Sequence, residues 1–166
     1  HDWIEFLDRS GIETTVVFPT HGLGFGLITD PEWACGLAVA YNNWLSERYM
    51  KITNRIKGVA LIPLQTPSEA VKELRRAVTQ LGMAGGVLPA AGLDKPLGHP
   101  EFWPIYQEAE QLDVPVAIHG APSRGLGIDF FKTFIEVHTL SHPLSQMIQM
   151  TSLIFQGVFD RFPRLR

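Results

Sequence analysis

A histidine in the middle of the chain stands where its chemistry needs an explanation. His119 ends a short apolar run over residues 114–118 that is rich in β-branched side chains, and Gly120 follows it. A run of this length between turn residues is typical of a strand buried on both faces. An imidazole at the end of such a strand must be hydrogen-bonded, charged or coordinated. The local residues leave two roles open for His119: a metal ligand or catalytic base, and a hydrogen-bonded core histidine.

The segment after His119, residues 121–141, is the least regular connection of the chain and is rich in Gly and Phe. Connections of this length in compact domains are usually functional or disordered. Arg124 lies early in this segment. Its guanidinium has the geometry to clamp a carboxylate by two parallel hydrogen bonds, and the alternative is a solvated loop arginine.

Three phenylalanines follow in the same segment, and water is a poor environment for them. Burial of each ring is worth roughly 1.5–3 kcal/mol. We therefore expect residues 128–137 to form an ordered cover or a subunit contact, which makes a homodimer a candidate assembly. The rings concerned are those of Phe130, Phe131 and Phe134.

Four other histidines are candidates with competing explanations. His21 lies in the loop that leaves the first predicted strand, where a substrate contact and a solvated loop residue are both open. His138 and His142 are four residues apart, a spacing that places both on one face of a helix. Pro143 disfavours the α region for His142, so the sequence predicts a helix that starts at Pro143 and no metal-binding histidine pair. His99 precedes a proline and is expected to start a helix.

A glycine-rich stretch follows the first predicted strand but lacks the pattern of a dinucleotide site. Residues 22–26 read Gly-Leu-Gly-Phe-Gly, and the third glycine of the fingerprint would fall on Leu27. The next helix begins only near Pro31, so no glycine lies at its N-terminus to receive a pyrophosphate. The stretch is interpreted as a flexible loop. The sequence contains neither a phosphate-binding G-x-x-x-x-G-K-[ST] motif nor a cysteine pair with zinc spacing.

Hydrophobic patterning predicts four strands that alternate with four helices, after a short helix over residues 2–10. The strands are expected at residues 14–18, 57–62, 84–88 and 114–119, and the helices begin at Pro31, Pro67, near His99 and at Pro143. Asp30 is expected to cap the first of these helices, and Thr66 with Glu69 to form a capping box on the second. The last helix is expected to bury one apolar stripe, made of Leu144, Met147, Ile148, Thr151, Phe155, Val158 and Phe159.

Alternation of strands and helices at this spacing predicts an α/β fold of right-handed βαβ units with a parallel sheet. Two architectures fit: a small doubly wound sheet, and about half of a TIM-type (β/α)8 barrel. Both place a functional site at the carboxyl ends of the strands. We therefore expect those ends to face one side, with His21 and His119 near each other.

Length and charge narrow the class of protein. At 166 residues a single domain, residues 1–166, is expected. A net charge of −3 and a pI near 6.1 give no electrostatic footprint for nucleic acid. The lone Cys35 excludes an internal disulfide and fits a reducing compartment. With no signal-peptide pattern and no apolar run that would span a bilayer, a cytoplasmic protein without a membrane partner is expected.

Several stretches of the sequence follow one another in an order and at a spacing like those of a known enzyme family. They are residues 57–65 (KGVALIPLQ), 73–77 (ELRRA), 96–106 (PLGHPEFWPIY), 114–120 (VPVAIHG) and 157–166 (GVFDRFPRLR). Together they resemble the amidohydrolase-related branch of metal-dependent barrel enzymes, the group that contains aminocarboxymuconate-semialdehyde decarboxylase. The resemblance implies a (β/α)8 barrel of which this chain is a middle piece, with its strands corresponding to the second to fifth.

The resemblance also implies a chemistry. The family holds a divalent metal, often zinc, with a histidine at the end of the fifth strand, and His119 matches that position. The family's other ligands, an H-x-H motif on the first strand and an Asp after the eighth, have no counterpart in this sequence. The implied reaction is hydrolysis or non-oxidative decarboxylation of a small unsaturated or aromatic carboxylic acid, with His21 and Arg124 as candidate substrate-binding residues. The alternative is a non-catalytic small-molecule-binding or structural α/β domain.

Overall fold

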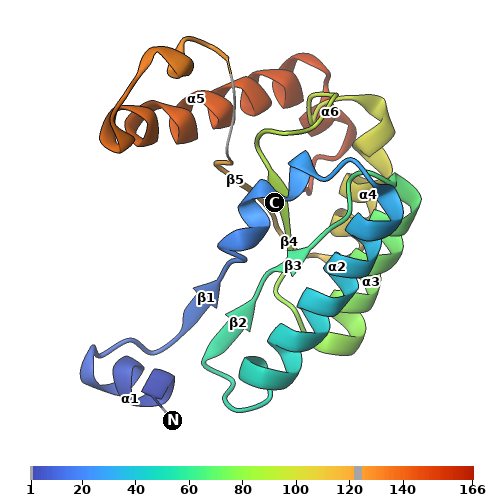
Figure 1. Cartoon of the computed structure of the whole chain (residues 1–166). Helices are drawn as coiled ribbons and strands as arrows, with labels where there is room; N and C mark the ends of the chain where they lie inside the picture. The colour runs from blue at the N-terminus through green and yellow to red at the C-terminus, as the bar shows by residue number, and fades with distance from the viewer. Residues whose placement is uncertain (1, 122–124) are drawn as a thin grey trace.

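The computed structural model describes residues 2–121 and 125–166 and confirms the alternation of strands and helices (Figure 1). Along the chain the elements are α1 (Asp2–Arg9), β1 (Thr15–Val17), η1 (His21–Leu27), α2 (Pro31–Leu45), η2 (Ser46–Met50), β2 (Ile56–Gly58), β3 (Ala60–Leu61), α3 (Pro67–Leu81), β4 (Gly86–Pro89), η3 (Pro100–Phe102), α4 (Trp103–Leu112), β5 (Val116–His119), η4 (Ile128–Phe130), α5 (Phe134–Phe155) and α6 (Val158–Arg161). The glycine-rich stretch expected to be a flexible loop is the 3-10 helix η1. In the described part of the chain, every helix is too short or too polar to cross a membrane.

The order of the strands distinguishes the two architectures. All pairs are parallel: β1 with β2, β3 with β4, and β4 with β5. The Val59 N–H donates to the Val17 carbonyl and the Ala60 N–H to the Gly85 carbonyl, so β2 and β3 are two parts of one predicted strand, over residues 57–62. Strands that neighbour one another in sequence order fit a barrel, because a doubly wound sheet reverses its order at a switch point.

The sheet continues in the same order at its free edge. The Val116 N–H, at the start of β5, donates to the Arg166 carbonyl at 2.7 Å. Arg166 also donates from its guanidinium to the Asp113 carbonyl at 3.1 Å. After α6 the chain therefore returns to lie beside β5, on the side away from β4.

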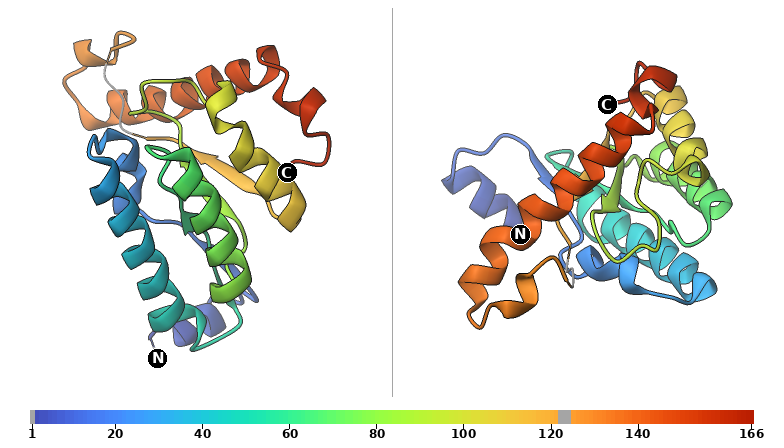
Figure 2. Two further views of the ribbon diagram at one scale, coloured as in Figure 1. Left: turned by 90° about the vertical axis from the view of Figure 1, so that its right-hand side faces the viewer. Right: turned by 90° about the horizontal axis from the view of Figure 1, so that it is seen from above.

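The helices cover the strands in two ways. In Figure 1 the helices α2, α3 and α4 lie along one face of the strands, whereas α5 crosses above their carboxyl ends; Figure 2 shows the same crossing from two further sides. The Gln149 side chain accepts from the Leu97 N–H and donates to the Ala90 carbonyl, both at 2.8 Å. Gln146 donates to the Ile118 carbonyl at 3.2 Å. Polar side chains thus hold α5 over the strand ends.

The start of α5 differs from the prediction. A Thr-x-x-Glu motif begins at Thr66 and another at Thr133, and the expected capping box at Thr66 is wrong: its side chain makes no cap bond, and the Glu69 N–H donates to the Thr66 carbonyl instead. The capping box forms at Thr133, where Glu136 accepts from the Thr133 N–H at 3.1 Å. This box starts α5 well before Pro143, which lies inside the helix rather than at its beginning.

The apolar stripe expected to face inward is wrong over α5, although its residue Val158, which lies in α6, is buried. Met147 is 63% exposed and Phe155 is 83% exposed. The buried positions of α5 are Ser141, Ser145, Gln149 and Leu153. The physical reason is the place of α5: it lies on loop carbonyls and N–H groups, which need side chains that donate and accept hydrogen bonds.

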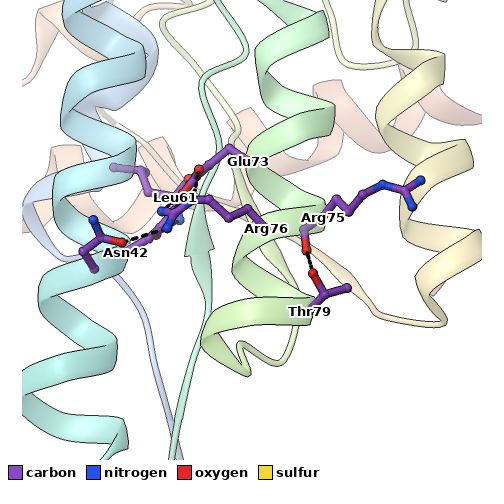
Figure 3. Close-up of polar contacts among 7 residues, drawn as sticks. Asn42, Leu61, Glu73, Arg75, Arg76 and Thr79 are labelled. Carbon is purple, nitrogen blue, oxygen red and sulfur yellow. Dashed lines mark hydrogen bonds and ion pairs between the residues drawn. The ribbon is translucent and has the colours of Figure 1, made fainter.

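A buried amide completes the middle strand where β1 no longer pairs with it (Figure 3). The Asn42 side chain, 0% exposed, donates to the Leu61 carbonyl at 3.0 Å and accepts from the Leu61 N–H at 2.9 Å. Glu73 accepts from Asn42 at 2.6 Å and from two guanidinium nitrogens of Arg76 at 2.8 Å. The register of β1 with β2 ends at Gly58, so Asn42 takes the place of a neighbouring strand.

We expect Asn42→Leu in the intact protein to lower the free energy of unfolding by at least about 2 kcal/mol. The substitution leaves two buried backbone groups of Leu61 unpaired, and each such group costs about 1–3 kcal/mol. Urea denaturation followed by circular dichroism measures the loss. The matched control is Asn43→Leu, which removes one bond from Arg76 at a half-buried position and should cost less than about 1 kcal/mol. Equal losses in the two variants would contradict the role of Asn42.

Candidate active site

The carboxyl ends of the first and last strands converge. In a flat sheet of this order β1 and β5 would lie about 14 Å apart. The rings of Phe18, just after β1, and His119, at the end of β5, have centroids 5.8 Å apart. The segment after β1 thus lies beside the end of β5, and the expectation that these ends face one side is confirmed.

A cavity of about 470 Å³ lies between the segment after β1, the end of β5 and the first part of α5. Its wall is formed by Thr20, His21, Leu23, Gly24, Gly120, Ala121, Phe134, Val137, His138, Ser141 and His142. His21 and the residue that follows His119 thus line one cavity, as the sequence led us to expect. Arg124, the other substrate-binding candidate, lies outside the described residues.

The hydrogen bond of His119 determines which of its nitrogens is free. His119 is half-buried, and its Nδ1 lies 2.8 Å from the Gly120 carbonyl oxygen. A carbonyl oxygen only accepts, so Nδ1 carries the proton and donates. The lone pair of Nε2 is then free, which is the arrangement found in metal-bound imidazoles whose second nitrogen is held by a carbonyl.

His138 and His142 lie together in α5, so the prediction that separated them is wrong. Their ring centroids are 4.6 Å apart, and those of His142 and His119 are 6.2 Å apart. The Ser141 hydroxyl lies 3.2 Å from Nδ1 of His142. The restriction that Pro143 places on the preceding residue is a preference, and the capping box together with the contacts of α5 outweighs it.

A glycine allows His142 to approach the strand end. A Cβ atom built on Gly120 would lie 2.5 Å from Cδ2 and 2.9 Å from Cβ of His142. Such distances leave no room for any side chain at position 120. The glycine after His119 was therefore the one sequence signal for a close neighbour at this point, although it did not show which residue that neighbour is.

The described residues do not form a complete metal site. Within residues 2–121 and 125–166, no three or more His, Cys, Asp and Glu side chains are grouped so that they could hold an ion. His119 fits the chemistry of one ligand, since its Nε2 lone pair is free at the strand end. In this part of the chain a metal would find a single ligand rather than a complete set.

The phenylalanine-rich segment contributes one ring to the cavity wall but buries little of itself within the chain. Phe134 lines the cavity and is 79% exposed, Phe130 is 85% exposed, and Phe131 is half-buried. The single chain therefore does not bury the three rings, and a subunit contact stays a prediction. The Phe134 ring stacks on His138 at 5.1 Å between centroids and 15° between planes.

Comparison with known proteins gives the family. A family model described as amidohydrolase matches residues 3–166. The chain belongs to the amidohydrolase family. It is 29% identical to 2-amino-3-carboxymuconate-6-semialdehyde decarboxylase of Dictyostelium discoideum, over 98% of this chain and 45% of that protein. It is 33% identical to gamma-resorcylate decarboxylase of Rhodococcus jostii, over 98% of this chain and 53% of that protein.

Solved structures confirm the fold. The 2,6-dihydroxybenzoate decarboxylase from Rhizobium matches with a TM-score of 0.79 and 27% identity, over 98% of this chain and 53% of that one. The 5-carboxyvanillate decarboxylase from Sphingomonas paucimobilis matches with a TM-score of 0.84 and 24% identity, over 100% of this chain and 49% of that one. This amidohydrolase chain spans about half the length of the curated relatives it matches. Its parallel β/α repeats correspond to about half of a TIM-type barrel.

We expect Gly120→Ala in the intact protein to lower the free energy of unfolding by about 1–3 kcal/mol, the usual cost of overpacking. The new methyl group would meet the ring and the Cβ of His142, so α5 itself must move. Chemical denaturation measures the change. The control is Gly36→Ala in α2, where a Cβ meets nothing within 4 Å and a gain of about 0.5–1 kcal/mol is expected. If Gly120→Ala leaves the free energy of unfolding unchanged, the close approach of His142 in α5 to Gly120 is wrong.

Proposed function

We propose that the protein containing this chain is a metal-dependent enzyme that removes carbon dioxide, without oxidation, from a small aromatic or unsaturated carboxylic acid. The observation that carries the proposal is the free Nε2 of His119 at a strand end that opens onto a cavity. The relatives named above are decarboxylases, which favours decarboxylation over hydrolysis. Membership of an enzyme family disfavours a purely structural domain.

In this proposal His119 is one protein ligand of a divalent ion. Relatives crystallised with manganese support this assignment: a dihydroxybenzoic acid decarboxylase from Polaromonas and a 5-carboxyvanillate decarboxylase from Novosphingobium aromaticivorans. Manganese is therefore the first metal to test, with zinc, which the family resemblance implies, as the second. When bound, such an ion polarises and orients a substrate oxygen.

The chain's own residues bind and orient the substrate. Hydrogen bonding to Gly120 keeps the imidazole of His119 in one tautomer and one direction. His21, which lines the cavity from η1, is assigned a substrate contact. Phe134 and Val137 supply an apolar part of the lining from α5 and reduce the water around a bound ring.

The activity is tested on the intact protein loaded with Mn²⁺ or Zn²⁺. The probes are carboxyl-labelled 2,6-dihydroxybenzoate and 5-carboxyvanillate, the acids named for the decarboxylases that match this chain. Release of labelled carbon dioxide in equal amount to the decarboxylated phenol supports the proposal. No release from either acid, together with hydrolysis of an ester or amide analogue, would overturn decarboxylation in favour of hydrolysis.

The assignment of His119 is tested by His119→Ala in the same protein. Removal of a metal ligand should lower metal content and turnover together, with turnover reduced at least about a hundredfold, while the barrel still folds. Elemental analysis, turnover and the thermal midpoint are measured on one sample. His99→Ala is the control, because the ring of His99 lies at the start of η3, where it accepts from the Glu101 N–H and lies near the Glu101 carboxylate. A variant with full metal, normal turnover and a lower midpoint would make His119 a core residue.

A further inference from the structure

The cavity beside His119 is lined by groups that suit an anion. Three histidines face it, His21, His138 and His142, together with the hydroxyl groups of Thr20 and Ser141. None of its described lining residues is an Asp or Glu. A volume of about 470 Å³ lies in the range of small-molecule sites. The wall therefore offers hydrogen-bond donors without a carboxylate to compete for them.

The hydrogen bond of His142 allows it the opposite tautomer to that of His119. The Ser141 side chain is buried, and its hydroxyl has Nδ1 of His142, at 3.2 Å, as its hydrogen-bonding partner in the described structure. A hydroxyl can donate to this nitrogen or accept from it. When the Ser141 hydroxyl donates, Nδ1 accepts, the proton of the neutral ring lies on Nε2, and His142 offers an N–H donor.

The position of His142 is fixed from several sides. The absence of a side chain at Gly120 lets the ring lie against the end of β5. The ring of His138, one turn earlier in α5, lies 4.6 Å away between centroids. His138 in turn stacks on Phe134 with the two ring planes 15° apart, and both residues line the cavity wall. A donor held beside aromatic rings is suited to a planar acid.

We propose that His142 is a substrate-binding residue whose Nε2–H binds the carboxylate of an aromatic acid, with the ring of the acid on the surface of Phe134 and His138. This inference rests on the proposed function and names a second element of the same site. His119 supplies a lone pair for a cation, and His142, 6.2 Å away between centroids, supplies a proton donor for an anion. The two histidines thus bind opposite charges.

The test compares two ligands that differ only by the carboxylate, 2,6-dihydroxybenzoate and resorcinol. In the intact protein with Mn²⁺, His142→Phe keeps a ring but removes the donor. Calorimetry should show 2,6-dihydroxybenzoate weakened about tenfold or more, the effect of losing a hydrogen bond to a charged group, with resorcinol within about twofold of wild type. His142→Gln, which restores an N–H donor, should recover most of the loss. His99→Phe is the control and should change neither affinity.

Each other outcome overturns the inference. Equal weakening of both ligands would mean that His142 only packs, and loss of Mn²⁺ by elemental analysis would make it a metal ligand. Unchanged binding of 2,6-dihydroxybenzoate would remove it from the site. The proposed function fails separately. If 2,6-dihydroxybenzoate binding depends on His142 but no carbon dioxide is released, decarboxylation is overturned and the role of His142 is kept. If carbon dioxide is released but binding does not depend on His142, the role of His142 is overturned and decarboxylation is kept.

Discussion

The site depends on the two hydrogen bonds by which the Asn42 amide pairs with the backbone of Leu61. Beyond Val59 the middle strand has no partner on the β1 side, and unpaired backbone groups in a core are costly. Because the amide satisfies both groups, β1 is free to leave the sheet. That departure brings Phe18 and the segment after it across to His119. A structural amide on α2 thus permits the convergence that forms the cavity.

A second polar contact sets the position of α5. Gln149 bonds to the backbone of Leu97 and of Ala90, which belong to the connection after β4. Hydrogen bonds fix direction as well as distance, whereas an apolar stripe would let a helix slide along its groove. The exposed apolar residues of α5 therefore do not determine its place. The turn that carries His138 and His142 is positioned by the glutamines farther along the same helix.

The sequence predicted the strands well, because short β-branched runs between Pro and Gly are compatible with few other structures. It placed His119 at a strand end for the same reason. It failed at α5, since Thr66 and Thr133 begin identical Thr-x-x-Glu patterns and only tertiary contacts decide which forms the box. It also failed for His142, because periodicity describes apolar faces, and this helix packs through its polar one.

The two histidines at the centre of the site show why residue type alone was insufficient. An imidazole accepts or donates at Nε2 according to what Nδ1 contacts. For His119 that contact is a carbonyl one residue away, and for His142 it is a hydroxyl one residue before it. Both partners are local in sequence, yet only the fold shows that no other residue of 2–121 and 125–166 bonds to these nitrogens. The fold therefore places each ring beside the neighbour that bears on its tautomer, and it brings the two rings to one strand end.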